Sequence, residues 1–172
     1  GWEMGQGLPT EQMASKYNAD KMAGIGFFND DNRNAIKGAE VYGHFSKGFV
    51  SGQPGTYQLV KSIAGYDEGS PYISPNQVLN YIEAHDNYNL NDLLWEFHPN
   101  DDVSRHTKRI ELANAMNILS QGMIFLQLGQ EFQRTKIYPT GTDMQVTAED
   151  KQRAMNSYNA PDRVNQVNWN LR

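Results

Sequence analysis

One stretch constrains this chain more than any other. Residues 78–88 begin with a largely apolar run, which ends abruptly at His85, Asp86 and Asn87. Such a run is typical of a buried strand of a parallel sheet. In α/β folds built on parallel strands, reactive side chains lie at the carboxyl ends of the strands, so we interpret the cluster as catalytic. An Asp at position 86 can instead cap the next helix, and spacing alone leaves both interpretations open.

Two further apolar runs predict two more strands. The run 25–28 is followed by Asn and Asp residues at 29–31, which suit the cap of a helix that ends at Gly38. We therefore expect these carboxylates to be caps rather than catalysts. The run 123–128 follows Gly122, and its continuous apolarity predicts a fully buried strand.

Helical spacing of apolar residues predicts two helices between the second and third strands. Residues 89–97 carry one apolar stripe, and Trp95 lies off it. Asp101 or Asp102 can cap a longer helix with its own apolar face. His106 is expected to be a solvated residue of that helix.

The remaining segments predict loops with short helices. Residues 40–74 are punctuated by Gly and Pro, which predicts a long loop with a helical turn at 57–63. His44 and the neighbouring aromatic residues can either contact a glycan or pin this loop to the core. Residues 132–172 are polar and irregular, with a weak helix expected from Thr147 to Met155 and capped by Thr147.

Composition excludes several classes of function. The chain has 172 residues, of which 38% are hydrophobic and 20% charged, and no apolar run reaches the roughly 18 residues of a membrane span. The net charge of −5, with scattered Lys and Arg, argues against nucleic-acid binding and suits a neutral substrate. The chain has no Cys, and its four His residues show no metal-site spacing, so we predict no metal site. Both a secreted or cell-surface and a cytoplasmic location stay open.

Three motifs add a family resemblance. They are Asn-Tyr-Ile-Glu-Ala-His-Asp-Asn-Tyr at 80–88, Leu-Gly-Gln-Glu-Phe-Gln-Arg-Thr-Lys at 128–136, and Asn-Ser-Tyr-Asn-Ala-Pro-Asp-Arg-Val-Asn-Gln-Val-Asn-Trp at 156–169. With them the chain resembles the type I pullulanases of the α-amylase superfamily over nearly its whole length. The His-Asp pair is shared by much of that superfamily, whereas the third motif is closer to the pullulanase branch. Asp31 and Asn168 depart from the family pattern.

The resemblance implies roles for particular residues. It makes Asp86 the carboxylate that stabilises the transition state. Glu131, which also follows an apolar run, is the rival candidate for a catalytic acid, but the resemblance gives it a structural place at the barrel rim. Two other carboxylates, the nucleophile and the acid/base, are expected upstream of Gly1. The residues implied in substrate binding are His85, Trp2, Asn87, Tyr158 and Asn159.

The resemblance also implies a fold class. It is α/β, a partial (β/α)8 TIM barrel that contains strands six to eight with their helices and long loops. Residues 1–172 would be the C-terminal part of the catalytic domain, with the N-terminal half and any accessory β-domains absent, because a complete barrel needs about 250 residues. Calcium is possible in the full-length enzyme, although this chain has no Asp-x-Asp-x-Asp-Gly loop.

These expectations lead to one leading function and two alternatives. The leading one is a fragment of a retaining glycoside hydrolase that cleaves α-1,6-glucosidic branch linkages in pullulan, starch, glycogen and limit dextrins. Its partner is an α-glucan, and the isolated fragment is expected to be inactive and to self-associate. The alternatives are a fragment of an isoamylase or an α-1,4-acting amylase, and a non-catalytic carbohydrate-binding piece.

Overall fold

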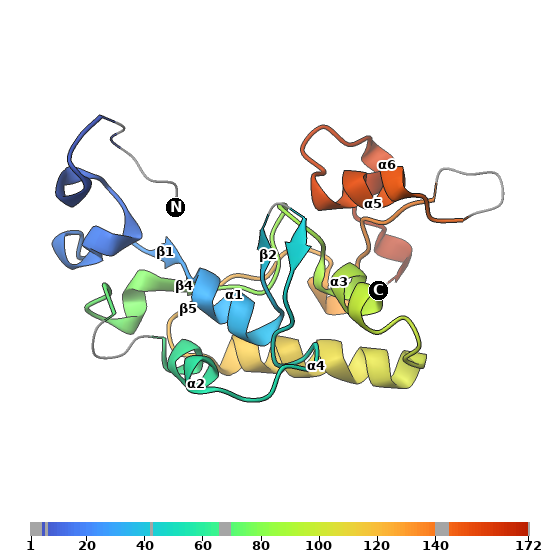
Figure 1. Ribbon diagram of the computed structural model, residues 1–172, viewed down its shortest axis with the longest axis horizontal. Helices are drawn as coiled ribbons and strands as arrows, with labels where there is room; N and C mark the ends of the chain where they lie inside the picture. The colour runs from blue at the N-terminus through green and yellow to red at the C-terminus, as the bar shows by residue number, and fades with distance from the viewer. Residues whose placement is uncertain (1–4, 6, 42, 66–69, 140–144, 172) are drawn as a thin grey trace.

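A small parallel sheet organises the chain (Figure 1). The computed structural model describes residues 5, 7–41, 43–65, 70–139 and 145–171. Strand β4 (Val78–Asn80) lies between β1 (Phe27–Phe28) and β5 (Met123–Ile124), and both pairings are parallel. In register, Leu79 is paired with Phe28 on one side and with Met123 on the other. The expected α/β class with three parallel strands is confirmed, although the strands are shorter than the apolar runs.

Buried amides connect the three strands. The side chain of Asn29 donates a hydrogen bond of 2.8 Å to Oδ1 of Asn80, and Nδ2 of Asn80 donates one of 2.7 Å to the carbonyl oxygen of Gln121. Asn29 also caps α1 (Asp30–Ile36), because its side chain accepts the N–H of Asn32. The expected strand, cap and helix are therefore confirmed in this segment.

Four helices build the main core. They are α1, α2 (Tyr57–Ala64), α3 (Leu90–Phe97) and α4 (Val103–Leu119), and α1, α2 and α4 pack against one another (Figure 1). Asp102 caps α4 by accepting the N–H of Arg105, as expected. No helix in the described part of the chain is long and apolar enough to span a membrane. The core residues that these helices share with neighbouring loops are Ile36, Val50, Leu59, Ile82, Leu90, Leu94, Ile110 and Ala113.

The long loop contains a hairpin as well as the expected helix. Strands β2 (Glu40–Val41) and β3 (His44–Phe45) pair antiparallel. Phe45 stacks on Tyr88 with ring centroids 5.4 Å apart, so this aromatic residue pins the loop to the core. His44 is exposed.

Short helices complete the first and last parts of the described chain (Figure 1). Near the N-terminus are the 3-10 helices η1 (Thr10–Gln12) and η2 (Lys16–Lys21), and η3 (Pro75–Gln77) precedes β4. Near the C-terminus, α5 (Ala148–Met155) begins with a capping box made by Thr147 and Asp150, so the weak helix predicted there is confirmed. The remaining elements are η4 (Gln130–Phe132), α6 (Asp162–Asn165) and η5 (Trp169–Leu171).

The prediction of a fully buried strand at 123–128 is wrong. Only Met123 and Ile124 form β5, and Met123 and Leu128 are 42% and 51% exposed. A continuous apolar run predicts that its side chains are buried against other parts of the protein, but it does not identify those parts. Within the described residues the run is only partly covered: Phe125 packs on Phe28, with ring centroids 5.8 Å apart, but Ile124 and Leu126 stay 37% and 49% exposed.

The prediction that His106 is solvated is also wrong. His106 is buried, its ring stacks on Trp95 at 3.9 Å between centroids, and its Nε2 lies 2.7 Å from Oδ1 of Asn91. The two rings lie on neighbouring helices, α3 and α4, and cover each other. Helical periodicity failed here because it scored His106 as polar and set Trp95 outside the apolar stripe.

Candidate active site

The candidate site lies just past the carboxyl end of the central strand β4. The chain continues from Asn80 through buried residues to Glu83 and then comes to the surface. There the side chains of His85 and Asp86 are 82% and 69% exposed, and Nε2 of His85 lies 3.4 Å from Oδ1 of Asp86. The sequence thus correctly predicted a strand that leads from the core to an ionisable pair.

The structure decides against the helix-cap interpretation of Asp86. Helix α3 begins at Leu90, and its N-cap position is occupied by Asn89. The N–H of Leu90 donates a 2.6 Å hydrogen bond to Oε2 of Glu83, which is buried. Glu83, and not Asp86, therefore provides the side-chain hydrogen bond to the first turn of α3.

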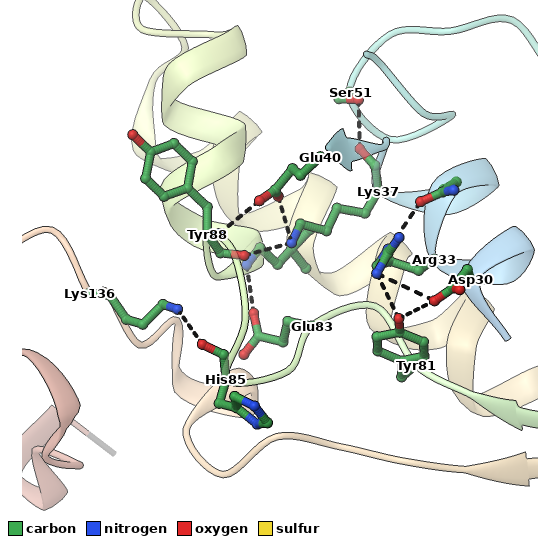
Figure 2. Close-up of polar contacts among 12 residues, drawn as sticks. Asp30, Arg33, Lys37, Glu40, Ser51, Tyr81, Glu83, His85, Tyr88 and Lys136 are labelled. Atoms are coloured by element: carbon green, nitrogen blue, oxygen red, sulfur yellow. Dashed lines mark hydrogen bonds and ion pairs between the residues drawn. The ribbon is translucent and has the colours of Figure 1, made fainter. Parts of the chain in front are cut away.

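Buried charged groups hold the backbone around Asp86 (Figure 2). Nζ of Lys37 donates a 2.6 Å hydrogen bond to the carbonyl oxygen of Tyr88, and the N–H of Tyr88 donates one of 2.7 Å to Oε2 of Glu40. Lys37 and Glu40 are themselves ion-paired at 2.9 Å. From the opposite side, Nζ of Lys136 donates to the carbonyl oxygen of His85 at 2.8 Å.

Asn87 turns the backbone between these anchors. Its φ is 60°, the left-handed region that Asn tolerates better than most residues. Asn87 is half-buried and, with Asp86, lines a cavity of about 60 Å³. The other residues around this cavity are Arg33, Lys37, Glu40, Tyr81, Glu83 and Ala84.

Two titratable groups in this cavity have shifted pKa values. Burial raises the pKa of Glu83 to about 7, and it outweighs the opposing hydrogen bond from Leu90 and the nearby charge of Lys37. Burial also raises the pKa of Tyr81 above its ordinary value. The Tyr81 hydroxyl accepts a hydrogen bond from Arg33 at 2.6 Å and donates one to Asp30 at 2.5 Å. The cavity below the exposed carboxylate is therefore polar, and Oε1 of Glu83 is buried there without a hydrogen-bond partner.

The other predicted substrate-binding residues lie elsewhere. Trp2 falls outside the described residues. Tyr158, which is 85% exposed, and Asn159 line a separate pocket of about 220 Å³ between α5 and α6. The adjacent Ser157 connects the two regions, because its hydroxyl accepts a hydrogen bond from Lys136 at 3.3 Å and donates one to the His85 carbonyl at 3.4 Å.

Sequence reasoning missed the buried charges that support the site. Glu83 sits inside an apolar run, and a carboxylate in that setting is a signal of a paired or functional group. Lys136 closes the second family motif but was assigned no role. Lys37 and Glu40 had no local signal, since only the fold brings them to Tyr88.

No metal site emerges from the described structure. Among the described residues, no group of three or more His, Asp or Glu side chains is placed to hold a metal ion. Glu131 accepts the N–H of Gly129 at 3.0 Å, and its expected role stays a prediction. Calcium in a longer enzyme stays a prediction.

Comparison with known proteins shows the relationship directly. No protein-family model matches the chain. A pullulanase of Bacillus subtilis (strain 168) is 36% identical over 177 residues, which cover 100% of this chain and 22% of that protein. The crystal structure of type I pullulanase from Bacillus subtilis str. 168 complexed with maltose superposes with a TM-score of 0.79 at 33% identity, covering 100% of this chain and 23% of that one. The crystal structure of pullulanase from Anoxybacillus sp. LM18-11 complexed with maltotriose superposes with a TM-score of 0.78 at 36% identity. The match covers 95% of this chain and 21% of that one.

The parallel sheet and its helices make this chain an α/β protein. It is a relative of the type I pullulanases over its whole length, and the resemblance found in the sequence is confirmed. The chain spans about a fifth of the length of the relatives that it matches.

Proposed function

We propose that this chain is the C-terminal part of a (β/α)8 catalytic domain. In this proposal β1, β4 and β5 are strands six to eight of the barrel, and the N-terminal half and any accessory domains belong to a longer protein. The parallel order of the three strands and the helices between them support this assignment. The exposed apolar side chains of the run 123–128 also support it, because a barrel interior would cover them.

The longer protein is proposed to be a retaining glycoside hydrolase that cleaves α-1,6-glucosidic branch linkages in pullulan and related α-glucans. One observation carries the proposal: Asp86 stands exposed at the carboxyl end of the central strand, on a loop held by buried charges, and it caps no helix. A carboxylate that caps no helix and lies beyond the carboxyl end of a parallel strand is in the position where catalytic residues of barrel enzymes lie. The pullulanase relatives supply the reaction class.

The chemistry divides between this chain and the rest of the enzyme. Retention requires a nucleophile and an acid/base with carboxyl groups about 5 to 5.5 Å apart, and both are assigned to residues that precede Gly1. Asp86 is assigned to hydrogen bonds with sugar hydroxyls that strengthen as the ring approaches the oxocarbenium ion. His85 would bind the same sugar.

The sugar-binding surface is proposed to extend from Asp86 along the rim. Asn87, Tyr158 and Asn159 would contribute to it, and so would Trp2, whose indole face can pack on sugar C–H groups. The Bacillus subtilis and Anoxybacillus relatives were crystallised with maltose and maltotriose, which are short α-glucans of the kind this surface would bind.

Digestion by the full-length protein tests the function. Purified enzyme should release maltotriose from pullulan, leave amylose intact and form products of retained anomeric configuration. Cleavage of amylose with pullulan untouched would favour the α-1,4-acting alternative. Binding of pullulan without any cleavage would support the non-catalytic alternative and overturn the proposal.

A further inference from the structure

Two lysines are buried beneath the loop that carries Asp86. Lys37 and Lys136 are each 1% exposed, although Lys is among the residues least often buried. A buried ammonium group is costly unless it is paired and hydrogen-bonded. Both lysines are hydrogen-bonded, because the Nζ atom of each donates to a backbone carbonyl within residues 85–88, and Lys37 is also ion-paired with Glu40.

Lys37 acts together with Glu40 on a single residue. The ammonium group of Lys37 donates to the Tyr88 carbonyl, while the carboxylate of Glu40 accepts the Tyr88 N–H. The hydroxyl of Ser51 donates to the carbonyl oxygen of Lys37 at 2.8 Å, which fixes the lysine backbone as well. The Lys37–Glu40 ion pair thus binds both the backbone carbonyl and the backbone N–H of Tyr88, two positions after Asp86.

Lys136 holds the other side of Asp86. Its Nζ donates to the His85 carbonyl and to the Ser157 hydroxyl, and its backbone N–H donates a 2.7 Å hydrogen bond to Oδ2 of Asp92 in α3. Burial lowers the pKa of Lys136 to about 8, so the ammonium group persists at neutral pH. The three contacts connect the loop, α3 and the segment before α6.

These contacts leave Asp86 between two fixed points, as Figure 2 shows for the flanking residues. The backbone is held at His85 by Lys136 and at Tyr88 by Lys37 and Glu40. The side chain of Asp86 itself stays exposed. Neutral polar residues would satisfy the same backbone groups, whereas charge-assisted hydrogen bonds are shorter and about twice as strong.

We propose that Lys136, and Lys37 with Glu40, are positioning residues that hold the 85–88 loop so that the Asp86 carboxylate meets the reacting sugar in a fixed place. The inference rests on the proposed function. A displacement of about 1 Å in such a group can lower the rate about 10²-fold. Loss of either anchor should therefore affect the rate of reaction more than the binding of substrate.

A double-mutant cycle in the full-length enzyme tests the proposal on pullulan. Lys136→Met should lower kcat by about 10- to 100-fold with KM changed by less than about threefold. In an Asp86→Asn background the same substitution should change kcat by less than about threefold, because Lys136 acts through Asp86. A residue that only stabilises the fold would instead produce the same loss in both backgrounds.

A second variant distinguishes a positioning role from a simple loss of folding. Lys37→Met combined with Glu40→Gln removes both members of the ion pair, so neither is left without its partner, and it should give the same non-additive result. Lys151→Met is the matched control, because Lys151 forms an ion pair of 2.6 Å with Glu96 on the surface, and it should leave kcat unchanged. Thermal midpoints of all variants are measured alongside kcat.

The outcomes separate the two claims. An active wild type in which both variants keep normal kcat, or lose it additively with Asp86→Asn, overturns the positioning role alone. A wild-type enzyme that does not cleave pullulan overturns the proposed function and this inference with it. Non-additive losses for both variants support the positioning role.

Discussion

At the scale of single residues, Glu83 has the clearest measurable signature. Its pKa is raised from 4.5 to about 7 by burial, so between these values the folded protein binds more protons than the unfolded protein. Stability from this group is therefore complete below about pH 4.5 and is lost as the pH rises through 7. Nearby Lys37 and Lys136 lower the pKa and Asp92 raises it, but burial outweighs them.

We expect Glu83→Gln to remove this dependence on pH. Glutamine keeps an acceptor oxygen for the Leu90 N–H but does not titrate. Relative to the variant, wild type should lose up to about 3 kcal/mol of unfolding free energy between pH 4.5 and 7. Chemical denaturation of the full-length enzyme at both pH values measures the difference.

Glu131→Gln is the control for this experiment. The Glu131 carboxylate also accepts a backbone N–H, that of Gly129, but the residue is exposed. Its variant should follow wild type at both pH values. A constant difference between wild type and Glu83→Gln across the range would show that Glu83 is not the titrating group.

How far the sequence predicted the site depends on the residue. His85 and Asp86 were predicted because they follow an apolar run, and the structure places them at the surface past β4. Lys37 and Glu40 were missed because their partner, Tyr88, is about fifty residues away in the chain and close only in the fold. His106 was misplaced because helical periodicity does not show that Trp95, on the neighbouring helix, stacks on its ring.

At the scale of elements, the junction between α4 and β5 depends on Gly122. Gly122 has a φ of +117°, and a Cβ built there would lie 2.5 Å from Cγ2 of Val78 in β4 and 2.9 Å from the carbonyl oxygen of Pro75. A side chain at this point would press directly against the central strand. The close approach of β5 to β4 therefore requires glycine.

Gly122→Ala should lower the free energy of unfolding by about 3 kcal/mol or more, the combined cost of backbone strain and overpacking. Gly24→Ala is the matched control, because Gly24 has a φ of +93° and no atom within 4 Å of its built Cβ. It should cost only about 1 to 2 kcal/mol from the backbone alone. Equal losses in denaturant unfolding would mean that the contact with β4 contributes nothing.

Helices were predicted better than strands, and capping explains why. The caps of α1, α4 and α5 are made by Asn29, Asp102 and Thr147, each a local signal within three residues of its partner. Strand bounds depend on neighbours distant in sequence. The apolar run at 78–84 therefore contains only three residues of β4.

At the scale of the whole molecule, the sheet has two open edges and an exposed apolar run. In the described structure, β1 and β5 each pair only with β4, and Met123, Ile124, Leu126 and Leu128 are all more than a third exposed. We expect the isolated chain to self-associate through these surfaces. Sedimentation velocity over a range of concentrations measures this, and a monomer with a sharp two-state melt would contradict it.

The isolated chain is also expected to lack activity. Asp86 alone does not replace a nucleophile and an acid/base, so no reducing sugar should be released from pullulan above a blank. The full-length enzyme at equal molarity is the positive control. Hydrolysis by the pure 172-residue chain would show that the reacting carboxylates lie within it.

The role of Asp86 is the central claim, and kcat of Asp86→Asn in the full-length enzyme tests it most directly. If the carboxylate stabilises the transition state, kcat on pullulan should fall by about 10² to 10³ or more, while the thermal midpoint stays near wild type because Asp86 caps no helix. Asp20→Asn, at another exposed aspartate, should leave both values unchanged. An Asp86→Asn enzyme with near-normal kcat would contradict the account.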